Sequence, residues 1–267
     1  MDLGVRGKGY LIVGGSAGIG LAAAAALVAD GAAVAIVGRN EERAARAASA
    51  LRAEREAHVV TLTGDVTVPG EAERIVAQAA AGLGSLRGVA VTSGLGRRGQ
   101  KDLLHATDDD WHDTFEDLLL GTVRVCRAVV PLLVKSGGGS IVTTAAYSIH
   151  SPKAHQFPYA TLKSAVATFT KDMAKTYGSS GVRANCVCPG ATETETLAAM
   201  RLRFAADRGW PVEQALERAM VEDWGMQVAL GRPGKPGELG DVIAFLLSER
   251  AGYLTGALIN IDGGTDF

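Results

Sequence analysis

Tyr159 and Lys163 form a pair whose residue types and spacing could do chemistry. They stand four residues apart in a segment, 158–175, that is predicted to be a helix beginning near Pro158, so both side chains project from one face. Tyrosine has an ordinary pKa of about 10, and a neighbouring ammonium favours its ionised form. The pair could therefore transfer a proton to or from an alcohol or carbonyl oxygen. Because Tyr and Lys fall four apart by chance in many helices, other features must support this assignment.

The turn at residues 14–20 is rich in glycine and lies between a predicted strand, 10–13, and an alanine-rich predicted helix. Glycines let the main chain approach a pyrophosphate closely, and the amino end of a helix offers unpaired N–H donors. This order of strand, turn and helix predicts a dinucleotide site. The alternative is a turn that serves only tight packing. The predicted phosphate-binding residues are Gly14, Ser16, Gly18, Ile19 and Gly20.

The end of the second predicted strand helps to distinguish two nucleotides. Proteins that bind NAD(H) commonly place Asp or Glu there for the ribose hydroxyls, whereas this chain has Arg39. A guanidinium can form forked, charge-assisted hydrogen bonds with a 2′-phosphate, so the sequence favours NADP(H), with NAD(H) as the alternative. Arg39 could also extend into solvent. Asp65, followed by Val66, comes after the third strand, where its carboxylate could meet the adenine amino group or serve only a turn.

Seven short apolar runs, rich in β-branched residues, alternate with segments that have helical patterns. Their hydrophobicity is continuous, which is typical of parallel strands covered on both faces by helices. The sequence therefore predicts one α/β domain over residues 1–267, doubly wound and of the Rossmann type, with a parallel sheet of about seven strands. The runs are 10–13, 33–37, 59–62, 88–92, 140–144, 183–187 and 257–261.

A helix is predicted after Thr107, which is a suitable N-cap residue. Three aspartates follow in the first turn, 108–110, where the helix dipole favours negative charge. Apolar residues then recur at helical spacing and predict one continuous stripe that faces the core. The stripe comprises Trp111, Phe115, Leu118, Leu119, Thr122 and Cys126.

Residues 192–231 separate two predicted core elements by more chain than a simple connection needs. We expect this insert to cover the substrate. Its aromatic and methionine side chains could form a small core of their own, contact the substrate, or do both. They are Met200, Phe204, Trp210, Trp224 and Met226.

The composition argues against several classes of function. The formal net charge is −2 and the pI is near 6.2, so no global field would draw the chain onto nucleic acid or anionic lipid. Cys126, Cys186 and Cys188 have neither metal-site nor disulfide-framework spacing, and fit burial in a reducing cytosol. No signal peptide, membrane span or metal-ligand cluster is predicted. We expect a cytoplasmic protein that binds neither membranes, nucleic acid nor metal.

Taken together, these residues resemble the short-chain dehydrogenase/reductase family along nearly the whole chain. The resemblance rests on Gly14, Gly18 and Gly20, on Asp65-Val66, on Tyr159 through Lys163, on Asn185 through Gly190, and on Thr255-Gly256 with Asp262 through Gly264. It implies a cytosolic homotetramer or dimer in which the tyrosine acts as acid and base. The lysine would bind the nicotinamide ribose and lower the pKa of the tyrosine.

The same resemblance implies which further residues surround the nicotinamide. The loop 189–194 would line it, with Thr194 at the hydroxyl position near the carboxamide. The cofactor-binding residues added in this way are Gly94, Pro189, Gly190, Thr192 and Thr194.

At two of the catalytic positions that the resemblance implies, the chain departs from the family pattern. Ala146 stands where the resemblance implies a catalytic serine, and Leu118 stands where it implies the asparagine that helps to hold a water chain to the lysine. An alanine cannot hydrogen-bond a substrate oxygen. We expect Ser148 to take over this role, with Thr144 and Tyr147 as the alternatives.

The leading hypothesis is an NADP(H)-dependent oxidoreductase that interconverts a ketone and a secondary alcohol on a small hydrophobic substrate, cyclic or of acyl type. One alternative is a nucleotide-binding relative with impaired or non-redox activity, which Ala146 and Leu118 motivate. Another is a 3-oxoacyl carrier-protein reductase, with a basic docking patch formed by Arg97, Arg98 and Lys101. His150 and His155 either flank the substrate entrance or face solvent.

Overall fold

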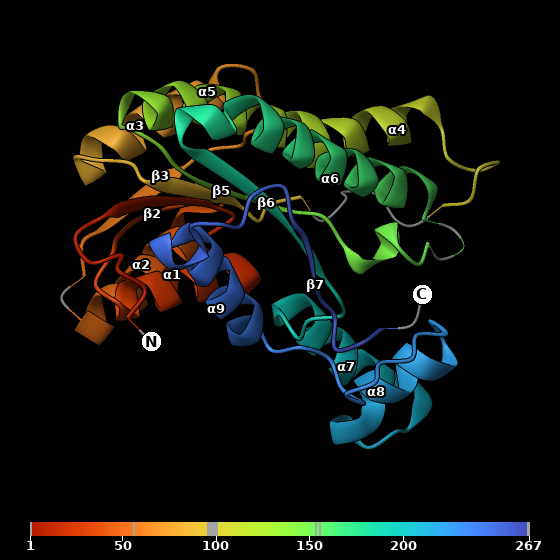
Figure 1. The fold of residues 1–267 in the computed structure, drawn as a ribbon. Helices are drawn as coiled ribbons and strands as arrows, with labels where there is room; N and C mark the ends of the chain where they lie inside the picture. Colours follow the sequence, from red (N-terminus) through yellow and green to blue (C-terminus); the bar gives the residue numbers. More distant parts are fainter. Residues whose placement is uncertain (1, 56, 95–100, 153, 155, 266–267) are drawn as a thin grey trace.

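A seven-stranded parallel sheet forms the centre of the molecule (Figure 1). The computed structural model describes residues 2–55, 57–94, 101–152, 154 and 156–265. The strands are β1 (Gly9–Val13), β2 (Ala33–Gly38), β3 (Val59–Thr63), β4 (Gly88–Val91), β5 (Gly139–Thr144), β6 (Val182–Pro189) and β7 (Leu258–Ile261). Their order across the sheet is β3-β2-β1-β4-β5-β6-β7. Each predicted strand is confirmed, with ends that differ by no more than two residues.

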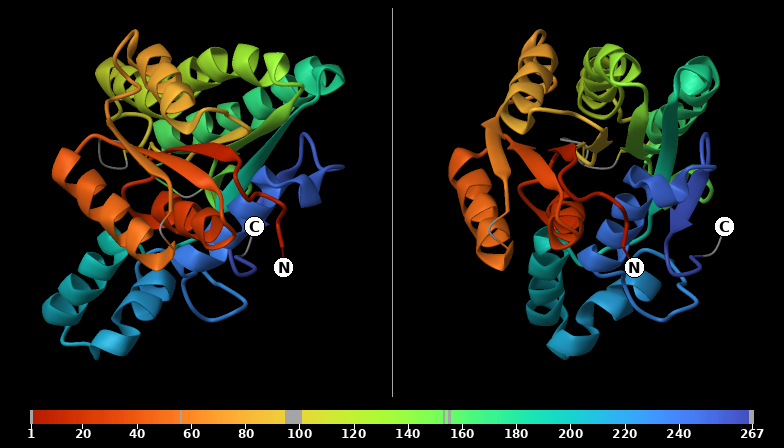
Figure 2. Two further views of the ribbon diagram at one scale, coloured as in Figure 1. Left: turned by 90° about the vertical axis from the view of Figure 1, so that its left-hand side faces the viewer. Right: turned by 60° about the vertical axis from the view of Figure 1, so that its left-hand side comes forward.

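Helices cover both faces of this sheet (Figures 1 and 2). One face carries α3 (Glu71–Leu83), α5 (Gly121–Lys135) and α6 (Phe157–Tyr177), and the other carries α1 (Gly18–Ala29), α2 (Glu41–Arg55) and α9 (Pro236–Leu247). In β1, Leu11 and Val13 pack toward the first group, and Tyr10 and Ile12 toward the second. Both faces of the sheet are buried, which explains why the strands have apolar residues at successive positions. The parallel sheet with helices on both faces confirms the predicted doubly wound α/β domain.

The order of strands creates a crevice at the carboxyl ends of the central strands β1 and β4. β1 lies between β2 and β4, and it pairs in parallel with both. The connections from β1 and β4 therefore leave in opposite directions, so their carboxyl ends diverge. Ligands bind at such a point in open α/β sheets.

The helix predicted after Thr107 is confirmed at its start and interrupted further on. Thr107 and Asp110 form a capping box at the start of α4 (Asp108–Thr114). A π-helical segment, Phe115–Leu120, then joins α4 to α5. The wider π turn changes the helical register. The predicted continuous stripe is therefore wrong at Phe115, which is 38% exposed, while Leu118 and Cys126 are buried.

A helical pair formed by α7 (Glu195–Arg208) and α8 (Val212–Glu222) stands apart from the two layers (Figure 1). Arg201 joins the pair, since its guanidinium lies 2.6 Å from a Glu193 oxygen and 2.8 Å from a Glu217 oxygen. Phe204 and Trp224 pack edge to face with their ring centroids 6.0 Å apart. The insert therefore has a small core of its own. Among the described residues, no helix combines the length and apolarity that a membrane span requires.

Helices α1 and α9 approach each other closely at Gly240, which yields a test of the packing. A Cβ on Gly240 would lie 2.6 Å from a main-chain carbon of Ala22, whereas a Cβ on Gly237 in the same helix would meet no described heavy atom within 4 Å. Gly240→Ala should lower the free energy of unfolding by about 1–3 kcal/mol through overpacking. Gly237→Ala should leave it unchanged or slightly higher. Urea unfolding of both variants measures this, and equal effects would contradict the assigned packing.

Candidate functional site

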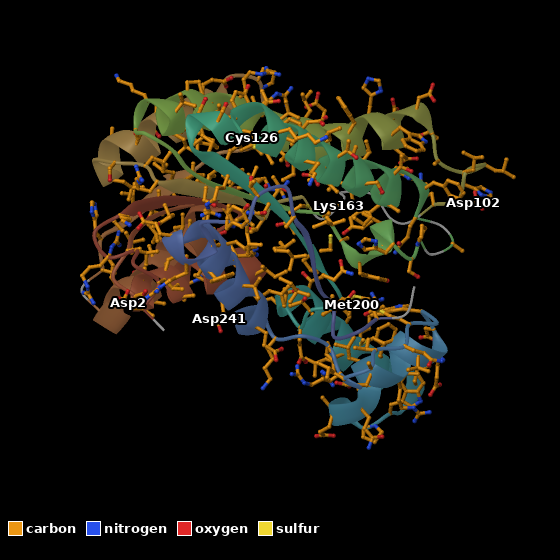
Figure 3. All side chains as sticks on the ribbon, in the orientation of Figure 1. Asp2, Asp102, Cys126, Lys163, Met200 and Asp241 are labelled. Atoms are coloured by element: carbon orange, nitrogen blue, oxygen red, sulfur yellow. The ribbon has the colours of Figure 1, made fainter. Side chains whose placement is uncertain are left out.

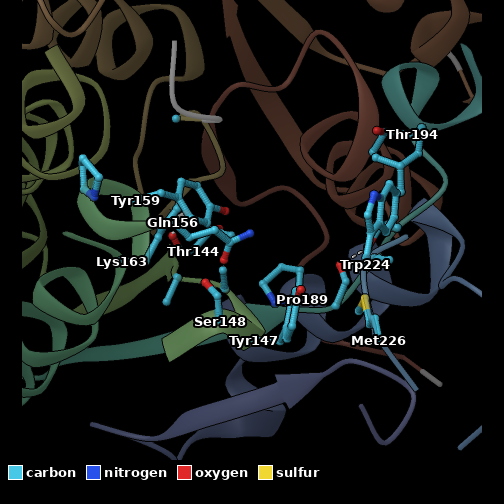
Figure 4. Close-up of a pocket in the computed structure, with 18 of the residues that line it drawn as sticks. Thr144, Tyr147, Ser148, Gln156, Tyr159, Lys163, Pro189, Thr194, Trp224 and Met226 are labelled. Atoms are coloured by element: carbon cyan, nitrogen blue, oxygen red, sulfur yellow. Dashed lines mark hydrogen bonds between the residues drawn. The ribbon is translucent and has the colours of Figure 1, made fainter. Parts of the chain in front are cut away.

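A cavity of about 840 Å³ opens at the carboxyl ends of the central strands. It lies between the sheet, the start of α6 and the pair α7–α8, and Figure 4 shows its principal side chains. Figure 3 labels two of the lining residues, Lys163 on α6 and Met200 on α7. Among the described residues that line the cavity are Ile19, Gly94, Thr144, Ala146, Tyr147, Ser148, Gln156, Tyr159, Lys163, Pro189, Gly190, Thr192, Thr194, Leu197, Met200, Trp224 and Met226. This cavity thus joins most of the residues singled out in the sequence.

The glycine turn connects β1 to α1 beside this cavity. Gly14 has a φ of +88°, and a Cβ there would lie 2.8 Å from the backbone nitrogen of Ser93. A Cβ on Gly20 would collide with the carbonyl oxygen of Gly14. Ala17, the N-cap residue of α1, makes no side-chain cap, which leaves the first amides of the helix available to an anion. The two glycines therefore let the turn pack tightly against the residues that follow β4, and the uncapped helix suits a pyrophosphate.

Arg39 follows directly on β2 and lies near Asp65. Its side chain is 61% exposed, and its Nη1 lies 3.9 Å from Asp65 Oδ2. The other carboxylate oxygen, Oδ1, accepts hydrogen bonds from the amide and hydroxyl of Thr67, at 3.0 and 2.8 Å. Ser16 packs against Gly38 at the end of the same strand. Val66 is buried against Gly121. Arg39 therefore presents a solvated guanidinium next to the glycine turn.

Tyr159 and Lys163 lie at the start of α6, on the cavity wall. The predicted helix is confirmed, beginning one residue before Pro158. Lys163 is 3% exposed, and its Nζ donates a hydrogen bond of 2.9 Å to the carbonyl oxygen of Thr144. The same nitrogen lies 5.8 Å from the centroid of the Tyr159 ring. The two side chains therefore share one polar region of the cavity.

Burial controls the protonation of both groups. It raises the pKa of Tyr159 to about 12, with a smaller contribution from Tyr147. It lowers the pKa of Lys163 to about 8, against the opposing influence of nearby groups such as Cys186 and Asp117. In the protein by itself, burial therefore acts against the lowered tyrosine pKa that the family resemblance implies. At neutral pH Tyr159 carries its proton.

Ser148 lies in a 3-10 turn, Tyr147–Ile149, that follows β5. It is 1% exposed, and its hydroxyl has no hydrogen-bond partner among the described residues. Ala146 lines the same cavity with only its methyl group. Leu118 is buried, and its carbonyl oxygen accepts a hydrogen bond of 2.9 Å from Thr122. The turn after β5 thus brings a hydroxyl into the cavity two residues beyond the alanine.

The loop after β6 forms the neighbouring wall. Pro189, Gly190, Thr192 and Thr194 all line the cavity. Thr194 precedes α7 without capping it through its side chain. Its Cγ2 would lie 3.1 Å from a Cβ on Gly18, so the loop meets the glycine turn.

Sequence reasoning missed Gln156, which precedes α6 and is 8% exposed in the cavity wall. The available signal was a glutamine at an N-cap position, where a shorter polar residue is usual. Lys101 also lines the cavity, and its Nζ lies 2.8 Å from Asp110 Oδ2. Arg97, Arg98 and His155 lie outside the described residues, and His150 is exposed.

Comparisons with known proteins agree with this arrangement. A family model described as enoyl-(acyl carrier protein) reductase matches residues 13–266. The protein named dehydrogenase/reductase SDR family member 4 of Oryctolagus cuniculus is 31% identical over 264 residues, which cover 96% of this chain and 93% of that protein. The chain belongs to the short-chain dehydrogenase/reductase family. The resemblance seen in the sequence is therefore confirmed.

Two further members of the short-chain dehydrogenase/reductase family have informative names. The 2,3-dihydro-2,3-dihydroxybenzoate dehydrogenase of Bacillus subtilis (strain 168) is 30% identical over 262 residues, covering 98% of this chain and 97% of that protein. The structure of L-sorbose reductase from Gluconobacter frateurii, complexed with NADPH and L-sorbose, has a TM-score of 0.92. It is 29% identical and covers 99% of this chain and 98% of that one.

Buried Lys163 predicts a pH-dependent stability. Its pKa is about 8 in the folded protein against 10.5 for an unperturbed lysine. Between these values the unfolded chain binds more protons, so the contribution of Lys163 to the free energy of unfolding rises with pH. Lys163→Met should remove this contribution, as measured by urea unfolding from about pH 7 to pH 9.5, below the ordinary tyrosine pKa.

Lys175→Met is the matched control for this experiment, because Lys175 is an exposed lysine of the same helix. It should keep the pH dependence of the unaltered protein. An identical pH dependence in Lys163→Met and the unaltered protein would show that the ammonium is solvated in the folded state.

Proposed function

We propose that this chain is an NADP(H)-dependent oxidoreductase that interconverts a ketone and a secondary alcohol. The observation that carries the proposal is the convergence, on one cavity, of a phosphate-type glycine turn and a buried Tyr159–Lys163 pair. A nucleotide held by the first would place its reactive ring near the second. The apolar side chains of α7 and of the segment after α8 would cover the substrate.

The residues present fit a nicotinamide dinucleotide. The turn needs glycine at three positions, because a Cβ there would collide with neighbouring atoms or disfavour the backbone conformation; these are Gly14, Gly18 and Gly20. Ser16, Ile19, Val66 and Gly94 would complete the walls around the dinucleotide, with Asp65 near the adenine. The loop from Pro189 to Thr194 would line the nicotinamide. The solved L-sorbose reductase, which was complexed with NADPH, supports the choice of cofactor.

Arg39 would bind the 2′-phosphate that distinguishes NADP(H) from NAD(H). Its guanidinium is exposed at the end of β2, and its ion pair with Asp65 is long, at 3.9 Å. A dianionic phosphate would therefore compete effectively for the guanidinium through shorter, charge-assisted bonds. NAD(H) remains the alternative that the binding experiment below tests.

Tyr159 would donate the proton in the reducing direction. The reduced nicotinamide, when bound, supplies a hydride to the carbonyl carbon. Tyr159 keeps its proton at neutral pH, since burial raises its pKa to about 12, and can give it to the alkoxide oxygen. Lys163 is fixed by the carbonyl oxygen of Thr144, which leaves further ammonium donors for the ribose hydroxyls.

Ser148 would hold the substrate oxygen in place of the serine that Ala146 replaces. Its hydroxyl is buried in the cavity without a partner among the described residues, so a ligand oxygen would satisfy it. Tyr147 and Thr144 also line the cavity and are the competing candidates. Lys163 donates its hydrogen bond to the main-chain oxygen of Thr144, so the hydroxyl of Thr144 is not used in that contact.

Location and assembly follow the family. We propose a cytoplasmic homotetramer or dimer. The buried thiols of Cys126, Cys186 and Cys188 fit a reducing compartment. Exposed apolar side chains near the edge strand β7, such as Tyr253 and Leu258, offer surface for a subunit contact.

An impaired or non-redox activity is the second candidate, favoured by Ala146 and the buried Leu118. A carrier-protein reductase is favoured less, because Lys101 of its docking patch is paired with Asp110. Tight nucleotide binding without turnover of any ketone would support the non-redox candidate. Failure to bind either nucleotide would contradict both candidates.

Arg39→Asp should reverse the nucleotide preference. The unaltered protein should bind NADPH more tightly than NADH, and the variant should lose about tenfold or more in NADPH affinity, because an attraction to the 2′-phosphate becomes a repulsion. Titration of the intrinsic fluorescence measures both affinities. Arg46→Asp makes the same charge change at an exposed position of α2 and should have little effect on either affinity. Equal losses in the two variants would indicate a general charge effect.

Tyr159→Phe should lower ketone-dependent NADPH oxidation by about 100-fold or more while leaving NADPH affinity nearly unchanged, because the variant lacks the acidic proton.

Ser148→Ala should lower kcat/KM about five- to 100-fold through loss of one orienting hydrogen bond. Tyr147→Phe is the matched control on the same turn. A greater loss in Tyr147→Phe than in Ser148→Ala would transfer the oxygen-binding role to Tyr147.

A further inference from the structure

Gln156 occupies the N-cap position of α6, yet its side chain does not cap the helix. An N-cap side chain ordinarily accepts a hydrogen bond from the amide of the second or third helical residue. Here the second residue is Pro158, which has no amide hydrogen. The main-chain oxygen of Gln156 accepts a hydrogen bond of 2.9 Å from Ala160, as the N-cap carbonyl of a helix ordinarily does. The side-chain amide of Gln156 is therefore left for another purpose.

That amide is buried in the cavity wall with an unsatisfied acceptor. Gln156 is 8% exposed, and its Oε1 has no hydrogen-bond partner among the described residues. The hydroxyls of Thr144 and Ser148 are in the same condition. Figure 4 shows these three side chains on the side of the cavity that carries Tyr159, away from Trp224 and Met226. Buried polar atoms of this kind are normally satisfied, so a ligand with several polar atoms fits this wall.

One carbonyl oxygen cannot satisfy all of these groups. It accepts hydrogen bonds, and Tyr159 and Ser148 would supply two donors. Gln156 Oε1 is itself only an acceptor, so it needs an O–H or N–H donor. Because Gln156 and Tyr159 are three residues apart at the start of one helix, this donor must lie close to the reacting carbonyl.

We propose that Gln156 recognises a hydroxyl on the carbon next to the reacting centre, so that the substrates are α-hydroxy ketones and the products are vicinal diols. This inference rests on the proposed function. The hydroxyl would donate to Gln156 Oε1 and accept from the hydroxyl of Thr144. It takes no part in the two-electron reduction, and its C–O and O–H bonds remain intact.

The opposite wall indicates the rest of the substrate. Leu197, Met200, Trp224 and Met226 line it and favour a hydrocarbon body, such as a ring. Apart from Lys163, which the proposed function assigns to the ribose, the charged residues described along the cavity are paired, since Lys101 bonds to Asp110 and Asp223 accepts from Arg208 at 3.0 Å. This pairing favours an uncharged substrate. A cyclic α-hydroxy ketone with an apolar ring combines both features.

The first arm of the test compares 2-hydroxy-1-tetralone with 1-tetralone, each with NADPH. The unaltered protein should prefer the hydroxy ketone by about tenfold or more in kcat/KM, because the ketone leaves buried polar groups unsatisfied. Gln156→Met keeps the length of the side chain and removes its amide. It should abolish the preference by lowering kcat/KM for the hydroxy ketone only. Gln214→Met, on the exposed side of α8, should keep the preference for the hydroxy ketone.

The second arm measures binding and does not depend on turnover. With NADP⁺ present, 1,2-dihydroxytetralin should raise the melting temperature of the unaltered protein more than 1-tetralol does, and Gln156→Met should remove this difference. If neither ketone is reduced, the proposed function fails, and this arm alone decides whether Gln156 recognises a second hydroxyl. Equal responses to the diol and the alcohol in the unaltered protein would overturn the inference. Equal losses for both members of each pair in Gln156→Met would also overturn it, since they indicate a structural role.

Discussion

The burial of one ammonium group, that of Lys163, constrains the rest of the site. A cation removed from water must keep hydrogen bonds, because desolvation of an unpaired charge is very unfavourable. The main-chain oxygen of Thr144, at the end of β5, supplies one of them. This contact fixes the start of α6 against the end of β5, and with it Tyr159 one turn before Lys163 and Gln156 about two turns before it. The polar wall of the cavity therefore follows from the accommodation of a single charge.

Burial also changes the protonation of this ammonium group. Leu118 is buried in the π-helical segment, and the pKa of Lys163 is lowered to about 8 by burial. Its protonation is then sensitive to what fills the cavity, since any bound anion or dipole changes the balance between desolvation and hydrogen bonding. The 3-10 turn that carries Ser148 places this serine in the wall of the same cavity.

The two walls of the cavity are held in place by different kinds of contact. The polar wall belongs to β5 and α6, which are continuous with the core of the sheet. The apolar wall belongs largely to α7 and the segment after α8, which are held by ion pairs of Arg201 and by main-chain hydrogen bonds from Ala229 and Leu230 to the C-terminal segment. Proton transfer requires fixed distances, whereas enclosure of a hydrocarbon requires only shape. The polar wall suits the first requirement and the apolar wall suits the second.

The sequence by itself determined the doubly wound sheet, the strands to within two residues, the glycine turn and the Tyr159–Lys163 helix. These features depend on local patterns: continuous apolar runs, glycine spacing and residues four apart. Sequence reasoning did not yield the exposure of Phe115, the raised pKa of Tyr159 or the unsatisfied amide of Gln156. Only the tertiary structure decided these, because burial and unmet hydrogen bonds depend on which distant segments surround a side chain, and no local spacing contains that information.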